Sequence, residues 1–490
     1  MVDEELSPAV MRKTVHLGTK LGSFESAQDS VAETLEVQLT TKRVERLTER
    51  IGRERVAERQ QAIADWESLP LVEKLAAPKG IKAPAVACVS CDGGRMQRCD
   101  LPEEAKSHWC ETKVGALLEL EANPHDADPC PQVPDTFLDL GRMEQVTREI
   151  HGAVPKGQTF VSVDKSDPPT PVDSTSVNST STDSTSTDST STDSTSTDST
   201  STDSTSIDST STDSTSADSP PPKPSEKKPS RRKTSRRKPT SPPNTPSLDV
   251  VAAAREAIIA EPPVVLNRDV VASLTKAESF GKHLAAHAWS LGFAAAILKV
   301  FIADGSSTNW GIWRREFKHL EFVPVLDFIH ALTYVYSAAM AGRSHEEGGP
   351  IYARWITWVW QGEVTRVIAE LAARAVELGS PPPNASETYP RQILANTITY
   401  LTNQQSRMNY PTYRKMGLPI TSSHIESTVK QVSRRVKGSE KFWTEQGGEA
   451  LLQLRADQLC DTAPLDTYWQ HRPQNATGTR NYKSPTQAAA

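Results

Sequence analysis

Three acidic residues stand at positions where folding could bring them together for metal-dependent chemistry. Asp92 and Asp304 each follow a short apolar segment and precede a glycine, and Glu426 lies near the start of a segment with helical periodicity. In an open α/β sheet the strand ends share one edge, so carboxylates from distant parts of a chain can converge there. Three such carboxylates could hold two Mg²⁺ or Mn²⁺ ions, which activate a water or a 3′-hydroxyl for in-line attack on a phosphodiester.

Each of these carboxylates also has a simpler interpretation. An Asp-Gly pair after a strand is commonly a turn, because Asp bonds its own backbone and Gly supplies a positive φ. Ser423 precedes Glu426 by three residues, and this spacing is typical of a capping box, in which the glutamate only satisfies a backbone amide at the start of a helix. The pattern alone leaves both interpretations open.

The elements that would position these residues alternate between strand and helix. Residues 85–92 predict a buried strand that ends in a turn at Asp92-Gly93-Gly94, and residues 95–99 predict a second strand after that turn. Further strands are expected in three segments: 109–120, which also fits a short helix, 297–305, and 322–330, which passes into a helix. A long helical pattern follows, and apolar stripes near the end of the chain predict two more helices.

Residues 1–80 predict a small helical module, because apolar residues recur at helical spacing among many Arg and Glu residues. Residues 27–35 and 41–50 could form a helix-turn-helix whose second helix carries basic residues toward a DNA groove, namely Lys42, Arg43, Arg46 and Arg50. The alternative is a solvated helical face whose Glu–Arg pairs serve stability alone.

A low-complexity region separates the early strands from the rest of the chain. Ser-Thr-Asp-Ser-Thr recurs with a period of five residues from 183 to 218, and residues 223–238 then hold nine Lys or Arg. A five-residue unit without a large apolar side chain cannot bury a face, so we expect 164–247 to be disordered. Its basic block could contact DNA phosphates or pair with the acidic repeats.

Composition narrows the class of protein. The net charge of −6 argues against a uniformly basic nucleic-acid binder, so any DNA contact must come from local patches. The chain has no apolar run of about 18 residues, and we expect a soluble, cytoplasmic protein that does not contact a membrane. The six cysteines are too few and too clustered for a disulfide framework, and their spacing does not favour a zinc site, so reduced thiols are expected.

Four segments resemble the core motifs of bacterial DDE-type insertion-sequence transposases of the ISKra kind, relatives of the Mutator group. They are VSCDGGRMQ at 89–97, IADG at 302–305, DFIH at 327–330 and PITSSHIESTVK at 419–430, and the last is the most specific. The resemblance covers roughly residues 27–150 and 250–470. It implies an α/β, ribonuclease-H-like mixed sheet with a helical insertion before the last catalytic residue, which matches the helical pattern at 331–408.

The resemblance also implies roles for individual residues. Asp92, Asp304 and Glu426 would be the catalytic, metal-binding triad for two Mg²⁺ or Mn²⁺ ions. Asp327 and His330 would be an accessory Asp-x-x-His pair, and their i,i+3 spacing could turn both toward a phosphate, a base or a second-shell metal contact.

Basic and aromatic residues near this motif have two interpretations each. Four cations follow Glu426 on one predicted helix and could either line a DNA path or form a solvated face, namely Lys430, Arg434, Arg435 and Lys437. Three tryptophans of the helical stretch fit either its core or a stacking platform for an unpaired DNA end, namely Trp355, Trp358 and Trp360.

The working hypothesis is a DNA transposase that cleaves and joins double-stranded DNA, acts as a homo-oligomer and is associated with the nucleoid in a bacterial cytoplasm. The alternatives are a catalytically decayed or domesticated copy that only binds DNA, and a generic metal-dependent nuclease. The expected segments are a helical N-terminal module at 1–80, a catalytic domain split over 81–163 and 248–330, a disordered linker at 164–247, a helical insertion at 331–415, a catalytic helix with C-terminal helices at 416–470, and a disordered tail at 471–490.

Overall fold

The computed structural model describes residues 6–102, 104–105, 107–121, 123–151 and 263–475. The linker predicted at 164–247 therefore lies outside the described residues, as does most of the predicted tail. The tail boundary was wrong by a few residues, because the helix α16 (Pro464–Asn475) continues past residue 470.

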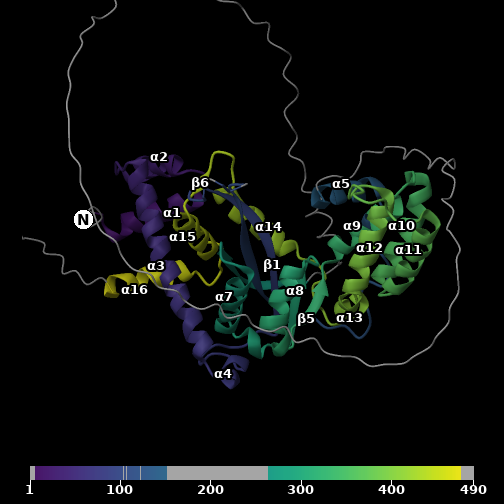
Figure 1. Cartoon of the computed structure of the whole chain (residues 1–490). Coiled ribbons are helices and arrows are strands. Elements are labelled where there is room, and N and C mark those ends of the chain that lie inside the picture. The colour runs from purple at the N-terminus through teal and green to yellow at the C-terminus, as the bar shows by residue number, and fades with distance from the viewer. Residues whose placement is uncertain (1–5, 103, 106, 122, 152–262, 476–490) are drawn as a thin grey trace, which may run out of the picture. The chain divides into compact units, whose positions relative to one another are not determined.

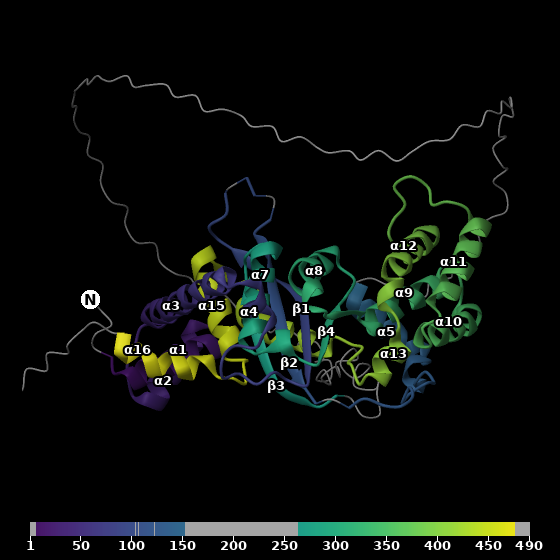
Figure 2. The ribbon, with the colours of Figure 1, turned by 90° about the horizontal axis from the view of Figure 1, so that it is seen from below.

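A mixed sheet organises the described residues, as the sequence predicted. Its strand order is β3-β2-β1-β4-β5, and a short sixth strand pairs with the end of β1. The central strand β1 is antiparallel to β2 and parallel to β4, while β2–β3 is antiparallel and β4–β5 is parallel; Figure 2 shows β1 to β4 side by side. The strands are β1 (Val86–Arg98), β2 (Trp109–Leu120), β3 (Val265–Ser273), β4 (Leu298–Ala303), β5 (Val323–Leu326) and β6 (Phe442–Trp443).

The first strand corrects one prediction. The expected turn at Asp92 and the separate strand after it do not exist, because β1 runs unbroken from Val86 to Arg98. Asp92, Gly93 and Gly94 all keep their pairing with β2. A Cβ at Gly94 would lie 2.6 Å from Thr112 Oγ1, so the glycine allows close packing on the strand instead of ending it. Residues 109–120 are a strand, and β3 was not predicted.

Two sets of helices cover opposite faces of the sheet. A Cβ at Gly115 of β2 would meet Leu284 and Phe280 of α7 (Ala277–Ser290). Its neighbours Val114 and Ala116 belong instead to an apolar cluster shared with α14 (Ser423–Val436) and α15 (Glu445–Asp457). Because side chains alternate along a strand, α7 lies on one face and α14 and α15 on the other.

The N-terminal helices pack against α15 and α16. They are α1 (Pro8–Lys20), α2 (Phe24–Leu35), α3 (Thr41–Ser68) and α4 (Leu71–Leu75). Ser7, Ser23 and Thr40 each cap a helix with a side-chain oxygen. The helices α2 and α3 flank the predicted break, but α3 is 28 residues long. It contacts α15 along an interface that includes the half-buried Arg59–Glu449 ion pair, with N···O at 2.8 Å.

Of the remaining helices, α5 precedes β3 in the chain, α8 follows β4, and α9 to α13 come between β5 and α14. Figure 1 shows α9 to α13 gathered together near β5. No helix within the described ranges is long and apolar enough to cross a membrane. These helices are α5 (Leu140–His151), α8 (Ser307–Ile312), α9 (Phe328–Met340), α10 (His345–Trp360), α11 (Val364–Leu378), α12 (Pro390–Gln404) and α13 (Tyr410–Lys415), with short 3₁₀ or π turns at Asp135–Phe137, Phe293–Ala295, Trp313–Phe317, Lys318–Leu320 and Gln405–Arg407.

Candidate active site

Three aspartates lie at matching register positions on or directly after the neighbouring parallel strands β1, β4 and β5. Ser90 of β1 pairs with Ile302 of β4, so Asp92 and Asp304, two residues further on, occupy matching positions. The amide of Asp327 donates to the carbonyl of Ala303 at 2.9 Å and extends the row to β5. Register thus brings together, across adjacent strands, acidic residues that are more than 200 positions apart in the sequence.

Asp92 faces the helix α14. Asp92, Gly94 and Met96 alternate onto one face of β1, and Met96 belongs to the apolar cluster that α14 and α15 form there. The half-buried Asp92 accepts a hydrogen bond from the amide of Gly93 at 2.6 Å on Oδ1. Asp92 is therefore an ordinary strand residue in backbone terms, and the turn interpretation does not apply to it.

Asp304 is held by the start of α8. Its Oδ1 accepts from the amide of Ser306 at 2.9 Å and from Asn309 Nδ2 at 3.0 Å, so the turn interpretation does describe its backbone. The buried Asn309 also donates to the carbonyl of Cys91 at 3.2 Å, and the Cys91 thiol donates to Asn309 Oδ1 at 3.4 Å. Asn309 thus links Asp304 to the strand that carries Asp92.

The pKa of Cys91 also indicates that Asp92 and Asp304 lie close to each other. Burial raises the pKa of the Cys91 thiol well above its ordinary value, and the nearby charges of Asp304 and Asp92 raise it further. The thiol therefore stays protonated and remains a donor to Asn309. All six cysteines are free, as the sequence predicted.

The turn after Asp304 is fixed from the other side by α12. Tyr400 donates from its hydroxyl to the carbonyl of Asp304 at 2.8 Å, and Gln404 Nε2 donates to the carbonyl of Gly305 at 3.1 Å. Gly305 has φ +101°, and a Cβ there would lie 2.7 Å from the Tyr400 ring. Tyr400 in turn stacks on Tyr334, with ring centroids 3.7 Å apart. The helical segment between β5 and α14 therefore supports the Asp304 turn directly.

Asp327 joins the end of β5 to the start of α14. It is fully buried, and its Oδ1 accepts from the amide of Ile329 at 2.7 Å, which caps α9. Its Oδ2 accepts from the amide of Ser422 at 3.1 Å and from the Ser422 hydroxyl. His330 Nδ1 lies 3.5 Å from the same Oδ2. The predicted Asp-x-x-His pair is thus in mutual reach, but Asp327 is engaged in the interior.

The helix α14 does not begin with the predicted capping box. Its N-cap is Ser422, and no side-chain hydrogen bond caps the helix; the Ser422 hydroxyl is directed to Asp327 instead. The capping interpretation of Glu426 is therefore wrong. Whether Glu426 can act with Asp92 and Asp304 therefore depends on where α14 positions it.

The placement of Glu426 follows from contacts at both ends of α14. Ser422 is tied to the end of β5, whereas Val429 and Ser433 lie 3.7 and 3.5 Å from where a Cβ of Gly94 on β1 would stand. Seven helical residues cover about 10 Å, and two strand spacings cover nearly the same distance, so the first turns of α14 run from the end of β5 to β1. Glu426 precedes Val429 and Ser433 by three and seven residues, so it lies along the same edge of the helix, on the side of Asp92.

The three carboxylates do not form a closed metal-ligand cluster. In the part of the chain that the structure describes, no group of three or more His, Cys, Asp or Glu side chains is arranged to hold a metal ion. The backbone brings Asp92, Asp304 and the first turns of α14 into one region, while Asp304 Oδ1 is turned toward Asn309. The oxygen donors suit Mg²⁺ or Mn²⁺ by chemistry, but their side chains are not gathered around one point.

The basic residues after Glu426 separate into two groups. Lys430, Arg434 and Lys437 are exposed, so they can reach a ligand. Arg435, expected beside them on a DNA path, is instead 2% exposed. Its Nε donates to the carbonyl of Gly18 at 3.0 Å, and its guanidinium lies 4.5 Å from the ring centroid of Phe24.

Arg435 therefore joins α14 to the N-terminal helices. Burial and the charge of Arg455 lower its pKa to about 10, so it remains protonated at neutral pH. Consecutive helical residues are about 100° apart, and this rotation separates the exposed Arg434 from the buried Arg435.

The tryptophans of the helical segment belong mainly to its core. Trp355 and Trp360 are buried, and their ring nitrogens donate to Glu370 and to the carbonyl of Cys130 at 2.6 and 2.7 Å. The half-buried Trp358 lies under the guanidinium of Arg366, 4.1 Å from its ring centroid. The core interpretation therefore accounts for Trp355 and Trp360.

Sequence patterns did not identify three residues of this site, Asn309, Tyr400 and Gln404. Asn309 carried a weak signal, a polar residue in the helix that follows Asp304-Gly305, and Tyr400 carried none, since it is 96 positions away. No protein-family model, curated protein or solved structure matches this chain.

Proposed function

We propose that this protein is a DNA transposase that cleaves and joins DNA strands through Asp92, Asp304 and Glu426. The observation that carries the proposal is the register of β1 with β4, which sets Asp92 beside Asp304. The packing of α14 against Gly94 then brings the helix of Glu426 over the same region.

The topology of the sheet supports the same proposal. An order β3-β2-β1-β4-β5 with two antiparallel and two parallel pairings is the arrangement expected of a ribonuclease-H-like fold. The helices α9 to α13 fall between β5 and α14, where the resemblance to DDE-type transposases places a helical insertion. Fold alone does not define activity, so the proposed activity depends on the three carboxylates.

In this proposal each residue has a defined task. The three carboxylates would hold two Mg²⁺ or Mn²⁺ ions, which when bound activate a water or a 3′-hydroxyl and stabilise the leaving oxygen. Asn309 orients Asp304, and Asp327 anchors the helix of Glu426. The exposed Lys430, Arg434 and Lys437 would contact the phosphates of double-stranded DNA. A homo-oligomer on DNA would bring two element ends together.

The test is metal-dependent strand cleavage by the full chain. The substrate is a supercoiled plasmid that carries the DNA flanking the coding sequence on both sides, incubated with Mg²⁺ or with Mn²⁺. Asp304→Asn retains an oxygen that can accept from Ser306 and Asn309, so the fold should persist while the charge is lost. We expect cleavage and joining to fall at least about 100-fold, as when one charge-stabilising group is removed from an active site.

The matched control is Asp65→Asn, which neutralises an exposed aspartate of α3, away from the three carboxylates, and should leave cleavage unchanged. Full activity of Asp304→Asn would refute the assignment. DNA binding by the native chain without cleavage in either metal would also refute it, and would favour a decayed or domesticated DNA-binding protein. Nicked products that never join would identify a nuclease.

A further inference from the structure

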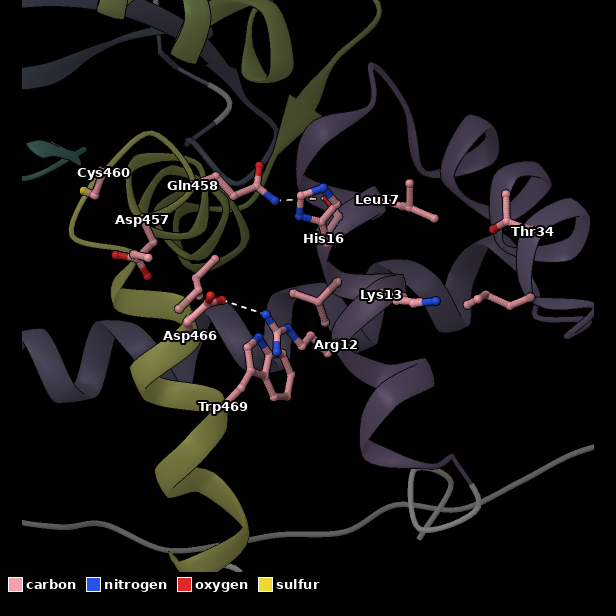
Figure 3. A pocket seen from close by; sticks show the side chains of 14 residues that line it. Arg12, Lys13, His16, Leu17, Thr34, Asp457, Gln458, Cys460, Asp466 and Trp469 are labelled. Carbon is pink, nitrogen blue, oxygen red and sulfur yellow. Dashed lines mark hydrogen bonds and ion pairs between the residues drawn. The ribbon is translucent and has the colours of Figure 1, made fainter. Parts of the chain in front are cut away.

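The first helix of the chain, α1, meets two consecutive C-terminal helices, α14 and α15, along one surface. Gln458, at the end of α15, donates from Nε2 to the carbonyl of His16 on α1 at 3.0 Å, as Figure 3 shows. Arg455 of α15 donates to Gln458 Oε1 at 3.1 Å and to the carbonyl of Gln431 on α14 at 3.3 Å. This chain of hydrogen bonds sets α1, α15 and α14 side by side.

Positive side chains line this surface from end to end. Arg12, Lys20 and Arg434 are exposed, and Arg455 and Lys441 are half-buried; Lys441 Nζ also donates to the carbonyl of Arg434 at 3.1 Å. We call these five residues the basic stripe. Among the described residues, acidic side chains contact the basic stripe only near its two ends. Asp466 pairs with Arg12 at 2.8 Å, and Glu440 lies near Lys441.

The cations of the basic stripe repel one another. Burial lowers the pKa of His16, and the charges of Lys20, Arg12 and Arg455 lower it further. Burial and the charge of Arg434 likewise lower the pKa of Arg455. A chain with net charge −6 therefore concentrates like charges on one surface, and a polyanion laid along it would relieve this repulsion.

The basic stripe continues the exposed face of α14 that carries Glu426. Glu426, Lys430 and Arg434 follow one another at i, i+4 and i+8, which spans about 12 Å of helix. Beyond Arg434 the surface passes to Arg455 and then to α1. A duplex held near Glu426 and following these charges would reach α1.

We propose that the basic stripe binds the phosphate backbone of double-stranded DNA and extends its path from α14 to α1. The direction of the path rests on the proposed function, whereas the binding itself does not. The N-terminal helices then contact DNA through α1 and not through the predicted recognition helix α3. On α3, Lys42 pairs with Glu45 at 2.8 Å and Arg50 lies 3.8 Å from Glu54, so part of its positive charge is already compensated.

The test measures DNA binding separately from cleavage. A fluorescently labelled duplex with the flanking sequence is titrated with the full chain carrying Asp304→Asn, and binding is followed by anisotropy between about 50 and 200 mM salt. The α1 variant adds Arg12→Gln and Lys20→Gln. Each lost phosphate contact reduces the slope of log affinity against log salt by about 0.9, so we expect a reduction of about 1.8 and at least tenfold weaker binding.

The matched control adds Lys42→Gln and Arg46→Gln on α3, which remove the same charge from two exposed residues of another helix. Equal urea midpoints for both variants confirm that folding is intact. The inference is overturned if the α1 variant binds DNA as its parent does, or if the control loses as much affinity. It stands, and the proposed function falls, if the native chain binds DNA through α1 yet never cleaves it. If the native chain cleaves DNA but the α1 variant binds it as its parent does, the proposed function stands and the inference about the basic stripe falls.

Discussion

Replacing Asp327 by alanine should loosen the start of α14 and lower the stability of the protein. The substitution leaves three buried donors without their acceptor: the amide of Ile329, the amide of Ser422 and the Ser422 hydroxyl. An unsatisfied buried group costs roughly 1–3 kcal/mol. Since the Ser422 hydroxyl can rotate toward another acceptor, we expect a total loss of about 3–5 kcal/mol in the free energy of unfolding.

Urea unfolding measures this loss, and hydrogen exchange locates it. The amides of the first turn of α14, near Glu426, should exchange faster in Asp327→Ala, while those of α3, among the N-terminal helices, should change less. Ser422→Ala removes only one donor and should cost about 1 kcal/mol. Because Asp327 and Ser422 are in contact, the double variant should show an interaction energy of at least about 0.5 kcal/mol.

The control is Asp466→Ala, which breaks the exposed pair with Arg12 and should cost no more than about 1 kcal/mol. The reasoning fails if Asp327→Ala is as stable as this control. It also fails if the exchange of the first turn of α14 is unchanged, since the loop before the helix would then be held by something other than Asp327.

Two further predictions concern other buried charges. Arg59→Ala should destabilise the protein by about 1.5–3 kcal/mol in urea unfolding, because the half-buried Glu449 loses its cation but keeps hydrogen bonds from Ser273 and Leu274. A loss below about 1 kcal/mol would mean that the pair acts like an exposed one. Burial raises the pKa of Asp269, but the hydrogen bond and charge of His287, together with hydrogen bonds from Thr462, outweigh burial and hold the pKa below the ordinary value. Its contribution to stability is therefore complete above the unfolded pKa of about 3.9 and is lost as the pH falls through the lower folded pKa. Urea midpoints measured from neutral to acidic pH should thus fall less steeply for Asp269→Asn, and equal slopes would contradict the assignment.

Local patterns predicted the parts of the fold that depend on neighbouring residues. The apolar runs before Asp92 and Asp304 predicted two strands of the sheet, and the apolar stripes near the end of the chain predicted α14 and α15. Where the local sequence fitted both a turn and a strand, pairing with a distant strand decided which of the two formed. Gly93 and Gly94 look like a turn in the sequence, but both stay paired with β2, and Gly94 lies against α14. The strand β3 was missed because its first half carries Asn267, Arg268 and Asp269, which interrupt the apolar pattern.

The difference between local patterns and tertiary contacts also explains why the sequence identified Asp304 but not the residues that hold its turn. An Asp-Gly pair after an apolar run is a local signal, whereas Tyr400 and Gln404 reach the turn from a helix about 100 positions away. Helical periodicity groups Arg434 and Arg435 as one basic run, yet only the packing of the N-terminal helices shows that Arg435 points inward to Gly18. A basic run on a helix therefore says little about DNA contact until its buried face is known.

The position of Glu426 depends on two contacts, neither of which involves Glu426 as a partner. Asp327 holds Ser422 at one end of the first turns of α14, and the missing side chain of Gly94 allows Val429 and Ser433 to approach β1 at the other. Movement at either contact would shift Glu426 relative to Asp92, because a helix moves as a rigid rod over so short a length. The geometry of the proposed triad is therefore a property of the sheet and of two anchors. Variants at these anchors should reduce strand cleavage even though every proposed metal ligand is retained.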